Sequence, residues 1–227
     1  MYFIILVGMP GSGKSYLHQK IKDFFNIKPV DIVIDNIIQK DKIYVSAIKK
    51  LLKTCKGDCI KTPSFKTYKN FADAYWYTRK NGCGKPICDD ASGCDCYNDT
   101  LLKNAIKKRK DIMFESALTM PLDWLFKLIP PEYEIVFFVN LINLKSIQKR
   151  INIRVKCEIK NKIAPRLPQS DKKYLVKRKL GLYKNLVGLL NQKDRKDRMI
   201  LYDNIHQDII YDGKPHVGLK KIIYSFK

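Results

Sequence analysis

The chain begins with a short apolar run followed by an amphipathic stretch. Residues 2–7 (YFIILV) are apolar or aromatic throughout, which predicts a strand buried on both faces. A glycine-rich segment follows, and beyond it the apolar residues recur at helical spacing, at Leu17, Ile21, Phe24 and Phe25. The start of the chain therefore predicts a strand, a glycine-rich turn and a helix.

The same alternation continues along the chain. Further strands are predicted at residues 31–36, 111–116, 134–140 and 198–204, and residues 208–214 are expected to add a hairpin arm. Helices are predicted over residues 41–56, 98–110 and 121–129, from about residue 144, and over about 171–192. Buried strands that alternate with helices indicate an α/β fold, with a parallel five-stranded sheet and helices on both faces.

We predict a single domain over residues 1–227. Residues 57–98 are rich in Cys, Gly, Asp and aromatic residues and are expected to form a small, irregular Cys-rich insert, in which FADAYWYTRK (71–80) predicts a short helix. Residues from about 150 to 192 are expected to form a loop segment with arginines, bounded by prolines, and a long helix.

The charge balance is strongly basic. Lys and Arg number 44 against 22 Asp and Glu, a net charge of +22, which favours phosphates, nucleotides and nucleic acid as partners. The lysines spread along the whole chain, so solvated helix faces explain the charge equally well, and a nucleic-acid partner stays an open alternative. No apolar run approaches the length of a membrane span, and no basic leader precedes the first strand, so we expect a cytoplasmic protein without membrane contact.

Seven cysteines are present, an odd number that favours reduced thiols over a disulfide framework. Four of them lie close together, at Cys83, Cys88, Cys94 and Cys96. Their spacing lacks the paired C-x₂-C of zinc knuckles, so free thiols are the simpler interpretation, and zinc binding stays open.

The glycine-rich segment matches G-x-x-x-x-G-K-[ST], and it lies between a predicted strand and a predicted helix, the context that this phosphate-binding loop requires. Glycines let several backbone N–H groups point at one anion, and the helix start adds partial positive charge. Lys14 is suited to the β- and γ-phosphates and the Ser15 hydroxyl to Mg²⁺. The predicted nucleotide-binding residues are Gly8, Met9, Pro10, Gly11, Ser12, Gly13, Lys14, Ser15 and Tyr16.

Polar residues at the carboxyl ends of the strands are the next candidates, because ligands of such sheets bind there. Asp35 is placed to accept a proton from an attacking hydroxyl, and Glu115 to hold Mg²⁺ through water; a helix cap or turn is the alternative for each. Ser116, Asn140 and Asp203 occupy similar strand ends.

Two arginines complete the predicted site. Arg154 and Arg166 flank and enter the proline-bounded segment APRLPQS (164–170), where a mobile lid would neutralise the transferring phosphoryl group, whereas Arg150 fits a solvated helix face. NQKD (191–194) departs from the guanine-reading motif. The histidines His18, His206 and His216 show no metal-ligand spacing and are interpreted as ordinary core or surface residues.

This set of motifs resembles the zeta-toxin-like branch of small P-loop kinases. The resemblance rests on GMPGSGKS, VIDN, FES, YEIVFFVNLINLKSIQKRINIR, APRLP and ILYDN, which together extend over most of the chain except residues 57–98. It implies that Lys14 and Ser15 handle ATP and Mg²⁺, that Asp35 is the base, and that Arg154 and Arg166 steady the γ-phosphate. The chain departs from the family after Asp35 and Glu115, where it reads IDNIIQ and ESAL, at positions that help hold the acceptor.

The sequence thus predicts a phosphotransferase that moves the γ-phosphoryl of ATP, with Mg²⁺, to a hydroxyl of a small molecule or nucleotide derivative. Two alternatives stay open: a polynucleotide or nucleoside kinase, favoured by the basic charge, and a nucleotide-binding switch protein without an acceptor.

Overall fold

The structure is a computed structural model that describes residues 1–54, 70–81, 96–166, 171–192 and 196–226. The described chain divides into two compact units. Unit 1 comprises Met1–Ile32, Leu101–Gln148 and Lys172–Lys227, and unit 2 comprises Val33–Thr100 and Lys149–Asp171. Each unit is described by itself.

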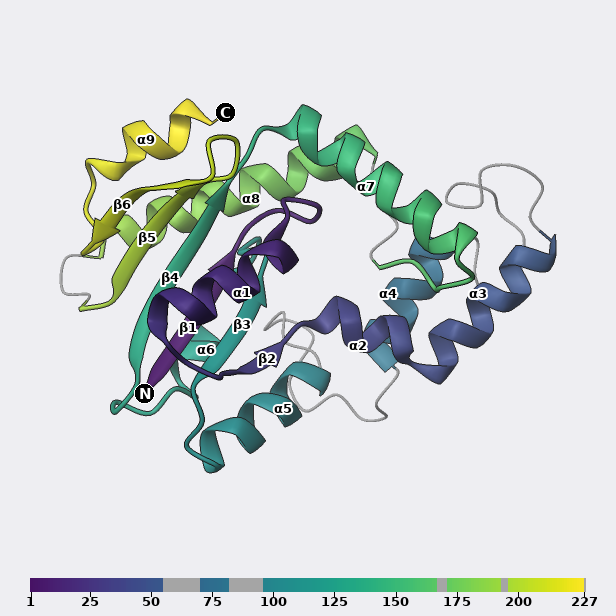
Figure 1. The fold of residues 1–227 in the computed structure, drawn as a ribbon, viewed down its shortest axis with the longest axis horizontal. Helices are drawn as coiled ribbons and strands as arrows, with labels where there is room; N and C mark the ends of the chain where they lie inside the picture. Colours follow the sequence, from purple (N-terminus) through teal and green to yellow (C-terminus); the bar gives the residue numbers. More distant parts are fainter. Residues whose placement is uncertain (55–69, 82–95, 167–170, 193–195, 227) are drawn as a thin grey trace. The chain divides into compact units, whose positions relative to one another are not determined.

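Unit 1 contains a six-stranded sheet in the order β2-β3-β1-β4-β5-β6 (Figure 1). The strands are β1 (Tyr2–Val7), β2 (Val30–Ile32), β3 (Ile112–Ser116), β4 (Glu134–Leu141), β5 (Arg198–Asp203) and β6 (Asp208–Gly213). The first five of these, β1 to β5, pair in parallel, which confirms the predicted five-stranded parallel sheet. The hairpin arm is a sixth strand, β6, which pairs with β5 in the antiparallel direction.

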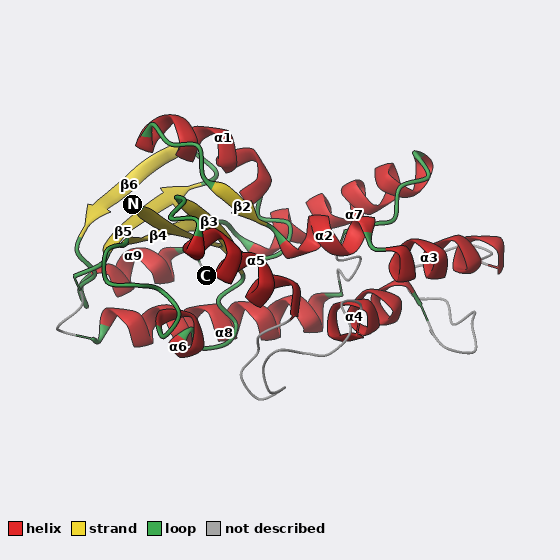
Figure 2. Cartoon of the chain, turned by 90° about the horizontal axis from the view of Figure 1, so that it is seen from below, coloured by secondary structure: helices red, strands yellow, loops and turns green. Residues whose placement is uncertain are grey.

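The central strand β1 is buried on both faces, as its unbroken apolar sequence predicts. Phe3 to Val7 have no exposed surface, because β3 and β4 flank the strand and helices cover the sheet. On one face, residues of β1, β3, β4 and β5 pack against Leu17 and Ile21 of helix α1 (Lys14–Phe25). On the other, Phe137 and Phe114 make ring contacts with α6 (Asp123–Phe126). Figure 2 shows α1 on one side of the sheet and α6 and α8 (Lys172–Leu190) on the other.

Two segments differ from their predicted structure. The strand predicted over residues 31–36 is shorter and earlier, Val30–Ile32, because only these three residues pair with β3. The chain then enters helix α2 (Ile34–Lys40), so Asp35 lies in the first turn of a helix instead of at a strand end. The helix predicted over residues 121–129 shortens to α6.

Unit 2 is built from helices. Among the described residues they include α2, α3 (Lys42–Thr54), α4 (Phe71–Asn81), the first residues of α5 (Cys96–Lys107) and the part of α7 (Leu144–Lys160) that begins at Lys149. The apolar faces of α2, α3 and α4 share one core with Ala164, against which Ile159 of α7 packs. Its buried members are Ile34, Ile38, Tyr44, Ala47, Ile48, Leu51, Phe71, Ala74, Tyr75 and Ala164. The short helix predicted within the insert is therefore confirmed as α4, and it contributes Phe71, Ala74 and Tyr75 to this core.

Helix α5 (Cys96–Lys107) leads into β3, and α9 (Leu219–Ser225) closes the chain. The cysteines Cys83, Cys88 and Cys94, and the side chain of Cys96, lie outside the described residues, so the predicted Cys-rich insert and its zinc alternative are not tested.

Candidate active site

The glycine-rich segment links β1 to α1 as the motif requires. The N–H of Gly8 donates to Ser116 O over 3.0 Å, which ties the end of β1 to the end of β3. Gly11 and Gly13 have φ values of 75° and 91°, a region that side chains disfavour. A Cβ on Gly8 would lie 2.8 Å from Ser12 Oγ. The loop conformation therefore depends on glycine at these three positions.

Lys14 lies over the loop that it follows in sequence. Its Nζ donates to the carbonyl oxygens of Gly8 and Met9, over 3.0 Å and 3.2 Å. The same Nζ lies 3.8 Å from Glu115 Oε2, and both side chains are 11% exposed. A cation held beside backbone N–H groups at a helix start suits a phosphate group.

Asn140 supports the loop from β4. Its Nδ2 donates to Ser12 O over 3.0 Å and to Ser12 Oγ over 3.2 Å, and both residues are buried. Asn140 is one of the strand-end residues that the sequence singled out. Its role here is to hold the loop, whereas the carboxylate of Asp203 accepts hydrogen bonds from Ile205 and His206 in the turn after β5.

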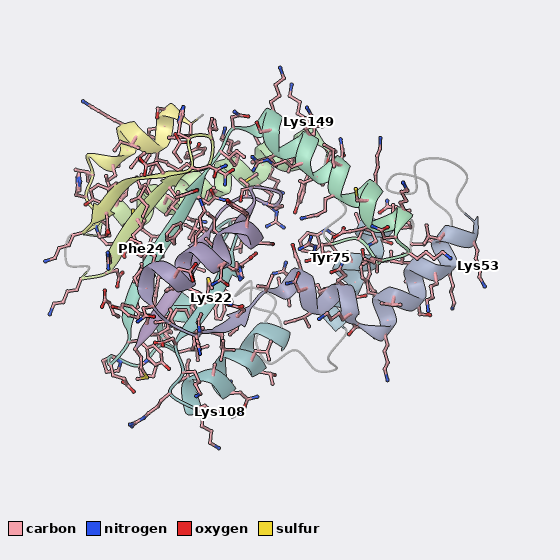
Figure 3. The ribbon with its side chains drawn as sticks, in the orientation of Figure 1. Lys22, Phe24, Lys53, Tyr75, Lys108 and Lys149 are labelled. Atoms are coloured by element: carbon pink, nitrogen blue, oxygen red, sulfur yellow. The ribbon has the colours of Figure 1, made fainter. Side chains whose placement is uncertain are left out.

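Glu115 makes its shortest contact with a residue that the sequence assigned no function. Oε1 of Glu115 lies 2.7 Å from His18 Nε2, and His18 Nδ1 lies 3.7 Å from Asp31 Oδ1. Burial lowers the pKa of His18, but the hydrogen bonds and negative charges of Asp31 and Glu115 outweigh it and raise the pKa to about 9. His18 is therefore an imidazolium at neutral pH, and Glu115 has cations near both oxygens. Lys22, labelled in Figure 3, extends the network to Asp31 through a 2.6 Å ion pair.

Helix α2 of unit 2 positions Asp35. The helix has Val33 as its N-cap and no side-chain cap, so the carboxylate of Asp35 is not used for capping. Instead its Oδ1 accepts a short hydrogen bond from the hydroxyl of Tyr75 in α4. Asp35 also acts electrostatically on Arg154, whose pKa is lowered by burial and raised in part by Glu158 and Asp35.

Both predicted arginines are organised by Glu158 of α7. The Nε of Arg166 donates to Glu158 Oε1 over 2.8 Å, and its backbone N–H donates to Oε2 over 3.0 Å. Arg154 lies one helical turn before Glu158, with Nε 3.8 Å from Oε2, and its Nη2 donates to Arg166 O over 2.6 Å. Glu158 is buried. No role was predicted for it from the sequence, because Arg154 and Arg166 were interpreted only as cations that bind phosphate.

The segment that carries Arg166 is tied to two further helices. Gln39 of α2 donates to Ala164 O over 2.8 Å, and the Tyr44 hydroxyl of α3 donates to Pro165 O over 2.6 Å. Residues 164–166 are thus fixed within unit 2 at every backbone carbonyl, and residues 167–170 of the predicted lid lie outside the described part.

The predicted site residues therefore fall into two groups. Unit 1 brings Lys14, Glu115 and the glycine loop together and adds His18. Unit 2 brings Asp35, Arg154 and Arg166 together and adds Tyr75 and Glu158.

Tyr16, at the loop end, is 60% exposed and has Lys20 Nζ 5.1 Å from its ring centre.

Among the described residues, no cluster of three or more His, Cys, Asp or Glu side chains is arranged to hold a metal ion. Every helix among them is too short or too polar to cross a lipid bilayer.

No model of a protein family and no curated protein matches the chain. Among solved structures it is similar to that of the PezAT chromosomal toxin–antitoxin system of Streptococcus pneumoniae, with a TM-score of 0.60 and 17% identity over 93% of this chain and 71% of that one. A gluconokinase from Sinorhizobium meliloti 1021 aligns over 99% of this chain and 90% of its own at 14% identity, but its TM-score of 0.37 is too low to bear on the fold. This likeness shows that the chain shares the fold of the PezAT structure, an α/β fold around a mostly parallel sheet.

Proposed function

We propose that the protein is a P-loop kinase that transfers the γ-phosphoryl group of ATP to a hydroxyl of a small molecule or nucleotide derivative. The observation that carries the proposal is the glycine loop between β1 and α1, with Lys14 Nζ held over it at 3.0 Å from Gly8 O. A loop of this kind is built for the phosphates of a nucleotide.

The two groups of residues supply different parts of the reaction. The loop amides and Lys14 bind the β- and γ-phosphates, and Tyr16 lies at the end of the nucleotide-binding stretch. Arg154 and Arg166 neutralise charge on the transferring group. The oxygen of the acceptor hydroxyl bonds to the γ-phosphorus, and Asp35 accepts the proton of that hydroxyl. The bond between the γ-phosphorus and the oxygen that bridges it to the β-phosphate breaks, which releases ADP.

The donor set at the loop also suits Mg²⁺, through the Ser15 hydroxyl and, by way of water, Glu115. The hydroxyl of Ser15 stands on an exposed residue at the start of α1, and the carboxylate of Glu115 is oriented by His18. The ion would neutralise charge on the phosphates. Because Glu115 Oε1 is engaged by His18, a contact with the ion's water shell would use Oε2.

The proposal is tested by a screen for transfer of labelled phosphate from ATP to nucleotide-sugars, nucleosides and oligonucleotides. Lys14→Ala and Asp35→Asn are run beside the wild-type protein, with nucleotide affinity measured by calorimetry. Both variants should lose transfer by about a hundredfold or more, and only Lys14→Ala should lose much affinity for ATP. Full activity in Asp35→Asn would remove its role as base.

The remaining outcomes separate the alternatives. Salt-sensitive transfer to 5′-hydroxyl oligonucleotides would identify a polynucleotide kinase, for which the net charge of +22 is the supporting observation. ATP binding without transfer to any acceptor would identify a nucleotide-binding switch protein.

A further inference from the structure

Tyr75 is a buried residue whose hydroxyl, among the described residues, has the proposed base as its only hydrogen-bond partner. It lies in α4, its side chain has no exposed surface, and it is labelled in Figure 3. Its ring stands edge-on to Tyr44, with ring centres 5.9 Å apart, and to Trp76, at 5.2 Å. The ring is thus fixed by packing, and its hydroxyl donates to Asp35 Oδ1.

The hydroxyl of Tyr75 acts as a donor in this contact. Burial raises the pKa of Tyr75 well above its usual value, and the negative charge of Asp35 raises it further, so the phenol keeps its proton. A buried phenol hydroxyl without a partner is unfavourable, because it has lost its water and gained no hydrogen bond, so burial favours the contact with Asp35. Because the donor is immobile, the carboxylate that accepts its bond is held in one orientation.

This contact leaves the second carboxylate oxygen of Asp35 for another donor. An ionised carboxylate has two oxygens that accept hydrogen bonds, and Tyr75 uses Oδ1. Asp35 is half-buried, and the described part of the chain provides no other hydrogen bond to its side chain. Since α2 does not use the carboxylate as a cap, Oδ2 is suited to a hydroxyl that approaches from outside.

We propose that Tyr75 is a positioning residue for phosphoryl transfer, which fixes the Asp35 carboxylate through Oδ1 so that Oδ2 faces the acceptor hydroxyl. The inference rests on the proposed function and deepens it. Helix α4 lies within the insert predicted over residues 57–98. Through Tyr75, this helix would take a direct part in the reaction. A purely structural tyrosine would stabilise unit 2 without influencing the chemical step.

Tyr75→Phe tests this inference, because phenylalanine keeps the packed ring and removes only the hydroxyl. The turnover number for transfer should fall about ten- to a hundredfold, as expected when a reacting group loses its orientation, while the Kd for ATP stays unchanged. Tyr133→Phe is the matched control. It removes the hydroxyl of another buried tyrosine, which donates to Lys110 O over 3.0 Å in unit 1.

The double variant Tyr75→Phe/Asp35→Asn distinguishes positioning from an independent effect. If Tyr75 acts through Asp35, removing its hydroxyl should not reduce the residual activity of Asp35→Asn any further. The inference is overturned if Tyr75→Phe turns over within twofold of Tyr133→Phe, or if its loss multiplies with that of Asp35→Asn. Wild-type protein without any transfer would overturn the proposed function as well, whereas wild-type transfer that Tyr75→Phe leaves intact would overturn this inference alone.

Discussion

Among single residues, His18 shows most clearly what a contact far apart in sequence can do. His18 and Glu115 are 97 positions apart, yet Nε2 and Oε1 lie 2.7 Å from each other. Neither residue belongs to a spacing pattern, so the sequence could not connect them. The contact becomes visible once β1 and β3 pair, because Glu115 then lies beside Leu6, close to the helix that follows the loop.

The raised pKa of His18 predicts a pH-dependent stability. The folded-state pKa of about 9 exceeds the ordinary 6.5, so the imidazolium contributes fully below pH 6.5 and its contribution is lost as pH rises through about 9. In His18→Gln this contribution is absent at every pH. The difference in unfolding free energy between wild type and variant should therefore shrink between about pH 6 and about pH 9.5 in urea titrations.

His216→Gln provides the control for this measurement, because His216 is an exposed histidine on the same unit. The effect assigned to the His18 contacts is the pH dependence that His18→Gln shows beyond that of His216→Gln. A difference from wild type that does not change with pH in His18→Gln would contradict the raised pKa of His18.

Glu158 predicts a second effect of one residue. The buried carboxylate accepts two hydrogen bonds from Arg166 and pairs with the partly buried Arg154. Glu158→Gln keeps the shape and removes the negative charge that compensates the partly buried guanidinium groups of Arg154 and Arg166. Unfolding free energy should fall by about 3 kcal/mol in chemical denaturation. Glu132→Gln, at an exposed position, should change it by less than about 0.5 kcal/mol, and an equal loss in both variants would contradict this role of Glu158.

At the scale of elements, the sequence predicted most of the sheet and least of the region around Asp35. The strands β1, β3, β4 and β5 are continuous apolar runs, and such runs are recognisable because a strand covered on both faces has no polar side. The segment DIVIDN (31–36) has a similar apolar pattern, but in this region only Val30–Ile32 pair with β3. Pairing length is a property of the sheet, so helix α2 could not be predicted from the segment itself.

Helix α8 offers a test of element stability at two glycines. A Cβ on Gly188 would meet nothing within 4 Å, whereas a Cβ on Gly181 would lie 3.0 Å from Thr119 O. Alanine lowers the entropy of the unfolded chain and favours helix in both cases. We expect Gly188→Ala to raise the unfolding free energy by about 0.5–1 kcal/mol. Gly181→Ala should gain less or lose stability, and identical gains in thermal denaturation would contradict the close contact with Thr119.

At the scale of the whole molecule, the charge is the dominant feature that the fold does not explain. The excess of 22 positive charges is not confined to one element. Lys53, Lys108 and Lys149, labelled in Figure 3, extend outward from three separate segments. Like charges in this number repel one another in the folded state. Nothing in the described contacts turns this charge into a defined nucleic-acid interface.

Self-repulsion predicts that salt stabilises the protein. Raising NaCl from about 0.01 M to about 0.15 M shortens the screening length from about 30 Å to about 8 Å, which weakens repulsion between distant lysines more than it weakens close ion pairs. The unfolding midpoint should rise by about 2–4 °C in calorimetry, equivalent to about 1 kcal/mol. Sucrose at equal osmolality serves as the uncharged comparison. A midpoint that falls with salt would show that attractive surface pairs outweigh the repulsion.

The way unit 2 is assembled has a consequence for any attempt to graft its polar residues into another protein of the same fold. Its residues come from two separate stretches of chain, with Asp35 and Tyr75 on the first and Arg154, Glu158 and Arg166 on the second. A graft of the first stretch alone would transplant a carboxylate and its tyrosine beside foreign arginines, and Gln39 and Tyr44 would lose the carbonyls that they bind. Asp35 and its surroundings should therefore be transferred only when both stretches are moved together as one module.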